Sequence, residues 1–284
     1  MLLKIFYVFP RFLVILTIWV RKMLLILGEP IDYVSRIINN KLDLPPLLLR
    51  KHVGPLSEFE TSGSEFAVYL KVLCELKANE KMLDIGCGCG LLAMNLKNYM
   101  NDEGRYVGVD INKPVIKWSQ RNVKKGNIFK FQHIDISNGY YRLQGSQNDS
   151  KFRFPFDDKK FDFIFLKSVF THMKMDGIVN YLQEIERMLS DNGRALVTFF
   201  VLNDEQAKLK KEGKNKLFFN FGDERTKWVC KNCPEMSIAF HEDDLLDKLK
   251  MCKLRLKKPI FYGTWAGREN SLYLQDMLLI EKDI

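Results

Sequence analysis

The residues most suited to chemistry lie in a glycine-rich stretch, MLDIGCGCG, at residues 82–90. Gly86, Gly88 and Gly90 alternate with other residues, and Asp84 precedes them. Glycines at such a point accept positive φ and let a ligand approach the backbone closely. A dinucleotide fingerprint, G-x-G-x-x-G, has its third glycine one residue later and binds a pyrophosphate. A carboxylate beside the turn opposes an anion, so the stretch predicts a ligand with a cationic group.

Two more acidic residues stand at the ends of the next two strands expected along the chain. Asp110 ends RYVGVD, about twenty residues after the glycines, where a carboxylate can accept from both hydroxyls of a ribose. Asp135 ends the following strand, where it could accept from an adenine amino group. The carboxyl ends of parallel strands meet at the ligand-binding edge of a sheet. The three acids therefore predict a nucleoside whose cationic end lies near Asp84.

Alternating strands and helices must position these acids. From about Ser64 onward, short apolar runs alternate with stretches of helical spacing, which predicts a mostly parallel sheet covered on both faces. The expected strands are KMLDIG, RYVGVDI, IFKFQHID, FDFIFLK and RALVTFFV. The turn SDNG is expected before the last of them. Two final runs, LRLKKPIFYG and SLYLQDMLLIEK, predict an antiparallel hairpin at the sheet edge.

Composition limits the class of protein. The chain has 284 residues and is 46% hydrophobic, which suffices for one large domain with an appendage. The six cysteines are scattered, so they do not suggest a secreted disulfide framework, and we expect a cytoplasmic protein. Of the net charge of +9, residues 1–55 carry +5. The remainder is mildly basic and predicts no specific nucleic-acid partner.

Several motifs occur in order along the chain, namely LDIGCGCG, VGVDIN, HIDIS, FDFIFLKSVFTHM and NGRALVTFFV. Together with the terminal hairpin they resemble the class I S-adenosylmethionine-dependent methyltransferases, over roughly residues 44–282. The segments LPPLLLRKHVG and YGTWAGRENSLYLQD are similar to a bacterial-type small-molecule branch of that family. The resemblance implies an α/β, Rossmann-like, doubly wound sheet of seven strands in the order 3-2-1-4-5-7-6. It places a methyltransferase domain at residues 44–284 after a helical extension at residues 1–43.

The resemblance also implies roles for individual residues, with S-adenosylmethionine as the cofactor. Asp84 and the three glycines would hold the methionine end, and Asp110 the ribose. The remaining cofactor residues would be Ile111, Asp135 and Ile136 around the adenine, with Lys167 and Ser168 facing the sulfonium. Cys87 and Cys89 are expected to be small residues of the turn rather than nucleophiles.

The acceptor is less defined. The segment LKSVFTHM, after the fourth strand, lacks the Asn/Asp-Pro-Pro-aromatic stretch of amino-directed DNA and glutamine methyltransferases. It also lacks the Pro-Cys nucleophile of cytosine-C5 enzymes. These absences favour O-, N- or C-methylation of a small molecule or a lipid. His172 is the candidate general base, and the alternative is a capping or core histidine.

Residues 203–240 interrupt the alternating pattern with a lysine-rich, aromatic insertion that we expect to cap the acceptor site. Its aromatic residues either line an apolar pocket or belong to the ordinary core: Phe218, Phe219, Phe221 and Trp228. Cys230 and Cys233, with His241 and Cys252 downstream, are a conceivable zinc set. A single CxxC is weak evidence, so we expect no metal.

The N-terminal segment is apolar, and its only charges before Glu29 are positive. After Pro10 its longest uncharged stretch covers residues 12–20, whereas a membrane-spanning helix needs about twenty apolar residues. Residues 1–28 therefore predict peripheral contact with an anionic membrane surface. The alternatives are a helix packed on its own domain or on a second subunit, and the oligomeric state stays open.

Two other functions compete with methyl transfer. The cofactor residues predict binding rather than turnover, so a non-catalytic S-adenosylmethionine-binding scaffold is one alternative. A nicotinamide-dependent dehydrogenase is the other, and the glycine spacing disfavours it.

Overall fold

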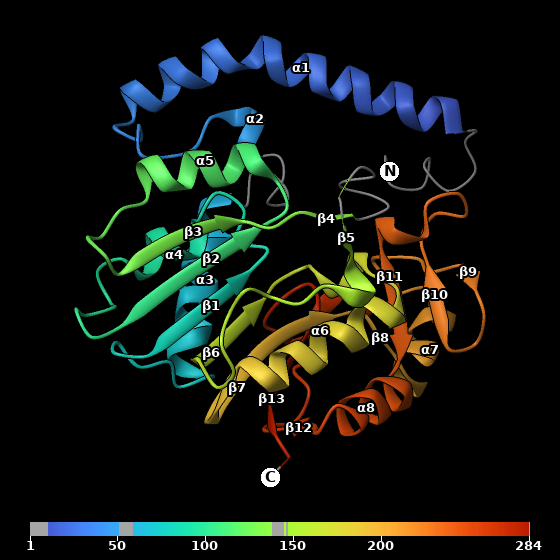
Figure 1. Ribbon diagram of the computed structural model, residues 1–284. Coiled ribbons are helices and arrows are strands. Elements are labelled where there is room, and N and C mark those ends of the chain that lie inside the picture. Colours follow the sequence, from blue (N-terminus) through green and yellow to red (C-terminus); the bar gives the residue numbers. More distant parts are fainter. Residues whose placement is uncertain (1–10, 51–58, 138–144, 146, 284) are drawn as a thin grey trace. The chain divides into compact units, whose positions relative to one another are not determined.

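The computed structural model describes residues 11–50, 59–137, 145 and 147–283 (Figure 1). The chain forms two compact units. The first unit comprises Met1–Glu80 and Cys87–Ile134, and the second comprises Lys81–Gly86 and Asp135–Ile284. Each unit is described by itself below.

Among its described residues the first unit pairs two strands and carries five α-helices. Strand β2 (Arg105–Asp110) runs parallel to β3 (Phe129–His133), in register from Tyr106↔Phe129 to Asp110↔His133. The fully buried ring of Tyr106 lies 5.1 Å from that of Phe129 and 5.8 Å from that of Phe131. The helices are α1 (Arg11–Ile38), α2 (Leu47–Arg50), α3 (Phe59–Val72), α4 (Leu91–Leu96) and α5 (Lys113–Asn122).

The second unit contains the larger part of the central sheet. Strands β1 (Lys81–Ile85), β6 (Phe161–Leu166) and β7 (Leu189–Phe199) are parallel, and β13 (Asp276–Lys282) pairs antiparallel with both β7 and β12 (Leu254–Leu256). Almost every residue of β6 and β13 is buried, as expected for strands covered on both faces. The α-helices of this unit are α6 (Met175–Met188), α7 (Asp204–Lys211) and α8 (Glu242–Met251). Its short strands β4 (Ile136–Ser137) and β5 (Gln147–Asn148) pair with each other.

The central sheet has the strand order β3-β2-β1-β6-β7-β13-β12. Numbered along the sheet-forming strands this is 3-2-1-4-5-7-6, so the predicted fold class and the C-terminal hairpin are confirmed. Near the start of β7 the expected SDNG turn is wrong, because these residues belong to the strand as a bulge. Phe161 pairs with Leu189 while Phe163 pairs with Arg194, so three extra residues protrude from β7.

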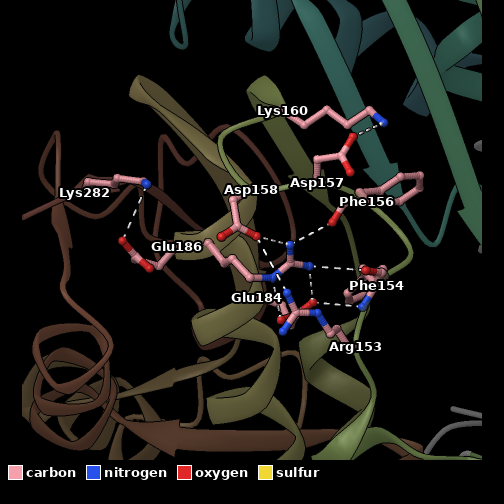
Figure 2. A network of polar contacts seen from close by, with 10 residues as sticks. Arg153, Phe154, Phe156, Asp157, Asp158, Lys160, Glu184, Glu186 and Lys282 are labelled. Atoms are coloured by element: carbon pink, nitrogen blue, oxygen red, sulfur yellow. Dashed lines mark hydrogen bonds and ion pairs between the residues drawn. The ribbon is translucent and has the colours of Figure 1, made fainter.

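A network of charges fixes the loop that enters β6 (Figure 2). Arg187 on α6 contacts Glu184 at 2.6 Å and Asp158 at 2.8 Å, and donates to the carbonyl oxygens of Phe154 and Phe156. The Glu184 carboxylate in turn accepts from the Phe154 amide at 2.8 Å. Because this network lies where β6 begins, at the opposite end from the ligand edge, we assign it to the fold rather than to the site.

The insertion and the residues that flank it form a second sheet. Strands β8 (Val201–Leu202), β11 (Ile238–His241), β10 (Thr226–Trp228) and β9 (Phe221–Gly222) lie in that order. Among the four aromatic residues considered above, Phe219 is 3% exposed and packs against Phe200 and Trp265, with ring centroids 5.1 and 5.2 Å away. Phe219 therefore belongs to the core, whereas Trp228 is only half-buried.

The N-terminal helix contains a proline. Helix α1 continues through Pro30 to Ile38. Pro30 costs one intrahelical hydrogen bond. Polar contacts of Glu29 and Asp32 with residues 47–50 hold the helix on both sides of it. Residues 1–10 lie outside the described part. In the part of the chain that is described, no helix is long and apolar enough to cross a membrane.

Candidate cofactor and acceptor site

The glycine turn uses the conformational freedom that its sequence implies. The φ angles of Gly86, Gly88 and Gly90 are 82°, 52° and 70°, all in the left-handed region. A Cβ added to Gly86 would lie 2.6 Å from Cγ2 of Val169. Side chains are thus excluded for two reasons at Gly86, its backbone conformation and its close neighbour.

The carboxylate of Asp110 lies against this turn within the first unit. Its Oδ2 accepts from the Gly88 amide at 2.9 Å, and its Oδ1 accepts from the Asn112 amide at 2.7 Å. Burial raises the pKa of Asp110, and these backbone hydrogen bonds partly oppose the rise. A carboxylate has about four lone-pair positions, and the backbone of Ile111 also hydrogen-bonds to it, so acceptor capacity remains for a further donor. A group that accepts in this way suits a ribose hydroxyl and does not suit a phosphate.

The backbone after Asp110 is fixed as well. The carbonyl oxygen of Asp110 accepts from the Ile134 amide at 3.1 Å, and Nε2 of His133 lies 3.1 Å from the Ile111 carbonyl oxygen. These contacts hold Ile111, which is half-buried, at the end of β2. An apolar side chain held there has a face available to a flat ring such as adenine.

The two cysteines of the turn are packing residues. Cys89 is fully buried, and burial, followed by the nearby Asp110 charge, raises the pKa of its thiol to about 12. Cys89 therefore stays protonated near neutral pH and is a poor nucleophile. Cys87 is also buried, with its Sγ only 2.8 Å from a Cβ built on Gly108.

The other predicted cofactor residues belong to the second unit. Asp84 is 3% exposed and pairs with Phe165 in the β1–β6 register. Asp135 is half-buried, and Ile136 is buried at the start of β4. Lys167 and Ser168 directly follow β6, at its carboxyl end.

Ser168 anchors a polar cluster that the sequence did not reveal. Its φ is 56°, in the left-handed region that favours glycine. Its amide donates to Oγ1 of Thr198 at 2.8 Å, and its hydroxyl donates to Oε1 of Gln275 at 3.0 Å. The Thr198 hydroxyl also donates to Oε1 of Gln275, at 2.7 Å. We call Ser168, Thr198 and Gln275 the Ser168 cluster.

The Ser168 cluster lies at the ligand edge of the second unit. Ser168 follows the carboxyl end of β6, Thr198 is near the carboxyl end of β7, and Gln275 directly precedes the antiparallel β13. The neighbouring Asp276 is fully buried and accepts from three donors at 2.7 Å, which fixes the start of β13. Thr198 and Gln275 were missed because neither belongs to a local motif. The one available signal was their position at strand ends of this edge.

Lys167 extends over an aromatic ring. Its Nζ lies 5.3 Å from the centroid of Tyr273, within the range of a cation–π interaction. An ammonium directed at a sulfonium would be repulsive. Because the Lys167 ammonium lies over Tyr273, the part of Lys167 suited to contact a cationic ligand is its backbone rather than its charged side chain.

His172 ties the segment after β6 to the insertion. It ends the short 3-10 turn Phe170–His172, and its Nδ1 lies 3.0 Å from the carbonyl oxygen of Glu235. Burial lowers the pKa of His172, and backbone hydrogen bonds to Glu235 and Met236 partly oppose the shift. A carbonyl oxygen only accepts, so Nδ1 carries a proton in its contact with Glu235.

Two buried polar atoms flank this junction. Nε1 of Trp228 and Oγ1 of Thr171 have no hydrogen-bond partner among the described residues. Thr171 precedes His172, while Trp228 lies on β10, which pairs with β11. A buried donor without a partner costs roughly 1–3 kcal/mol, so a polar ligand that supplied the missing partner would recover that energy.

The possible zinc set is not assembled. The Cys233 amide donates to the Cys230 carbonyl oxygen at 3.2 Å, which makes a turn of the CxxC segment. Within the described residues no three His, Cys, Asp or Glu side chains are grouped to hold a metal ion.

Comparison with known proteins places these features in context. The family described as "Methyltransferase domain" matches residues 76–253, more than half of the chain. An uncharacterized methyltransferase of Schizosaccharomyces pombe is 26% identical over 118 residues, or 42% of this chain. That match spans 39% of the yeast protein, so the chain covers less than half of this curated relative.

Two solved structures share the fold at low sequence identity. The PH0226 protein of Pyrococcus horikoshii is 16% identical, with a TM-score of 0.53 over 81% of this chain and 93% of that one. The 1,6-didemethyltoxoflavin-N1-methyltransferase of Burkholderia thailandensis is 15% identical, with a TM-score of 0.50 over 89% of this chain and 86% of that one. The latter was solved with its substrate and S-adenosylhomocysteine bound.

Proposed function

The chain belongs to the methyltransferase domain family, as a class I S-adenosylmethionine-dependent enzyme, and from this premise we propose that it methylates a small-molecule or lipid-like acceptor. The observation that carries the proposal is the contact between Asp110 and the Gly88 amide. It joins a strand-end carboxylate to a turn whose three glycines let a ligand approach the backbone, as a bound nucleoside requires.

The cofactor residues are proposed by position within each unit. In the first unit Asp110 would accept from the ribose hydroxyls, Ile111 would pack on the adenine, and Gly88 and Gly90 would admit the ligand to the backbone. In the second unit Asp84 and Gly86 would hold the methionine end, with Asp135 and Ile136 beside the adenine. Lys167 and Ser168 would contribute their backbone near the sulfonium.

A bound sulfonium supplies an already activated methyl group, so the protein's part in catalysis is mainly positioning and exclusion of water. The Ser168 cluster supports this role because two hydrogen bonds hold Ser168, directly after β6, and a third joins its partners Thr198 and Gln275 to each other. A backbone held in this way would position the methyl donor without rearranging during the transfer.

His172 is the proposed general base for an acceptor that carries a proton. Its lowered pKa keeps the ring neutral near pH 7, and because Nδ1 donates to the Glu235 carbonyl oxygen, Nε2 is the nitrogen proposed to take the acceptor's proton. The insertion that supplies Glu235 is proposed to cover the acceptor. Trp228 and Thr171 support this, since both have a buried polar group that an acceptor with oxygen or nitrogen atoms would satisfy.

Contact with a membrane would bring a lipid-like acceptor within reach of the protein. We propose peripheral attachment of a cytoplasmic protein through its N-terminal segment, residues 1–28. In sequence this segment has apolar residues and four positive charges and no acidic residue.

The test is transfer of label. Purified protein is incubated with methyl-labelled S-adenosylmethionine and separate aqueous and lipid fractions of a cell extract, and both the product and S-adenosylhomocysteine are quantified by mass spectrometry. We expect S-adenosylhomocysteine to form in proportion to labelled product in one fraction. Binding of the cofactor without turnover in any fraction would instead favour the scaffold alternative. Calorimetric titration with NAD(H) checks the dehydrogenase alternative, and we expect no heat of binding.

A further inference from the structure

Helix α1 is joined to the rest of the first unit through its polar side. The carboxylate of Glu29 accepts from the amides of Leu47 and Leu48 at 3.2 and 3.0 Å, at the start of α2. Asp32 pairs with Arg36 at 2.8 Å and also with Arg50. Figure 1 shows α2 beside α1, as these contacts require.

The remaining surface of the described part of α1 is apolar and exposed. Ile31 is 74% exposed and Ile38 77% exposed, and among the side chains described from Val20 onward only Leu25 and Arg36 are buried. We define the apolar face of α1 as the exposed residues Val20, Met23, Leu24, Ile26, Leu27, Ile31, Val34, Ile37 and Ile38.

These positions form one continuous surface. At about 100° per residue, residues 20, 24, 27, 31, 34 and 38 share a narrow stripe, and residues 23, 26 and 37 widen it to about half the circumference. A helix of a soluble protein normally packs its apolar side inward, whereas α1 packs its charged side inward. Single exposed apolar residues are ordinary, but a contiguous apolar surface of this size marks an interaction site.

The width of the apolar face favours lipid over another helix. A helix–helix seam covers a stripe of about two positions per heptad, which would leave half of this face in water. A lipid surface covers the whole arc of a helix lying in its plane.

Charge favours the same partner. Residues 1–55 have a net charge of +5 and residues 1–28 contain no acid. A second copy of the chain would bring the same positive charge, whereas an anionic leaflet carries the complementary one.

We infer that α1 lies in the plane of an anionic membrane, with the apolar face of residues 20–38 inserted and the Glu29–Asp32–Arg36 side turned toward the protein. This extends the attachment proposed above for residues 1–28 by residues 29–38, about three turns of helix, and it assigns the side that enters the lipid. It does not depend on methyl transfer.

The experiment compares three full-length proteins by vesicle flotation, using phosphatidylcholine vesicles with and without phosphatidylglycerol. One protein is wild type, and one carries Leu24→Gln, Leu27→Gln and Ile31→Gln. The control carries Val68→Gln and Val72→Gln on α3, whose side chains are 50% and 67% exposed but lie outside the apolar face. Glutamine is chosen because it keeps helix propensity.

We expect wild type and control to float with anionic vesicles, and the α1 variant to partition at least tenfold less. Equal flotation of all three proteins would overturn the assignment of the face. Absence of wild-type flotation would overturn the assignment of a membrane as the partner. If the wild type then sediments as a dimer and the α1 variant does not, the apolar face binds a second copy of the chain. Circular dichroism and binding of S-adenosylhomocysteine in the absence of vesicles are measured on each protein. Failure of wild type to bind this nucleoside would count against the proposed function alone.

Discussion

The glycine turn of the first unit and the Ser168 cluster of the second fix left-handed backbone at strand ends by different means. In the turn, Gly88 and Gly90 have positive φ because they lack a side chain, and one contact from Asp110 holds the loop. At Ser168 a residue with a side chain adopts a φ of 56°, and hydrogen bonds to Thr198 and Gln275 hold it there.

The difference lies in how far along the chain the supporting residues are. Gly88 and Asp110 are 22 residues apart, and one strand–helix–strand unit contains both. Ser168 and Gln275 are 107 residues apart, and His172 and Glu235 are 63 apart. The proposed cofactor residues of the first unit thus form a local structure, while Ser168 and the proposed base His172 depend on contacts with segments far along the chain.

The largest effect on the rate is expected at His172, the proposed general base for the acceptor. With the acceptor identified by label transfer, His172→Ala should lower kcat by about a hundred- to ten-thousand-fold, the range for loss of a general base. Affinity for S-adenosylhomocysteine should stay near wild type, since the cofactor is assigned to other residues.

His241, whose side chain is 40% exposed, provides the matched control, and His241→Ala should leave kcat within a factor of two or so. A fully active His172→Ala protein with a lower melting temperature would make His172 a structural link to the insertion instead.

The pH profile sharpens the same point. Burial lowers the pKa of His172, so its ring is neutral near pH 7 and becomes protonated only below its ordinary value of about 6.5. The wild-type rate should be level near neutral pH and fall as the pH drops through the lowered pKa. Stability changes in the same direction, because the unfolded chain binds this proton at a higher pH than the folded protein does. In His172→Ala the acidic fall assigned to this group should disappear from both the rate and the unfolding free energy.

The next effect concerns the first unit. Asp110→Ala removes the acceptor for Gly88 and Asn112 together with the proposed ribose contacts. Binding of S-adenosylmethionine should weaken by about 1–3 kcal/mol, roughly five- to 150-fold, as measured by calorimetry. Asp102→Ala, at an exposed acid of the same unit, is the control and should bind as wild type does. Unchanged affinity in a folded Asp110→Ala protein would exclude the ribose assignment.

The contrast between the units also explains what the sequence could predict. The strand order and Asp110 at the end of β2 follow from local apolar runs and residue spacing, because parallel strands leave such patterns. Gln275 could not be identified in this way, since its partners are residues of β7 and of the segment after β6. The orientation of α1 was also missed. Apolar composition indicated a surface helix, but only the contacts of Glu29 and Asp32 assign its inner side.

The smallest effect isolates the strain at Ser168. Both Ser168→Ala and Ser168→Gly remove the hydroxyl that donates to Gln275, but only glycine is comfortable at a φ of 56°. Ser168→Gly should therefore be more stable than Ser168→Ala by about 1 kcal/mol, the scale of the left-handed penalty, in urea unfolding.

The matched control is the same pair of substitutions at Ser64, which is exposed on helix α3. Because glycine disfavours a helix, Ser64→Gly should be less stable than Ser64→Ala by about 1 kcal/mol, the opposite of the order expected at Ser168. If the two Ser168 variants instead followed the order of the Ser64 pair, the backbone at Ser168 would be helical or extended in solution. The Thr198 and Gln275 hydrogen bonds would then not be holding a strained turn. Agreement with the expected order would show that residues from distant segments stabilise at Ser168 a left-handed conformation that Gly88 and Gly90 adopt without a side-chain penalty.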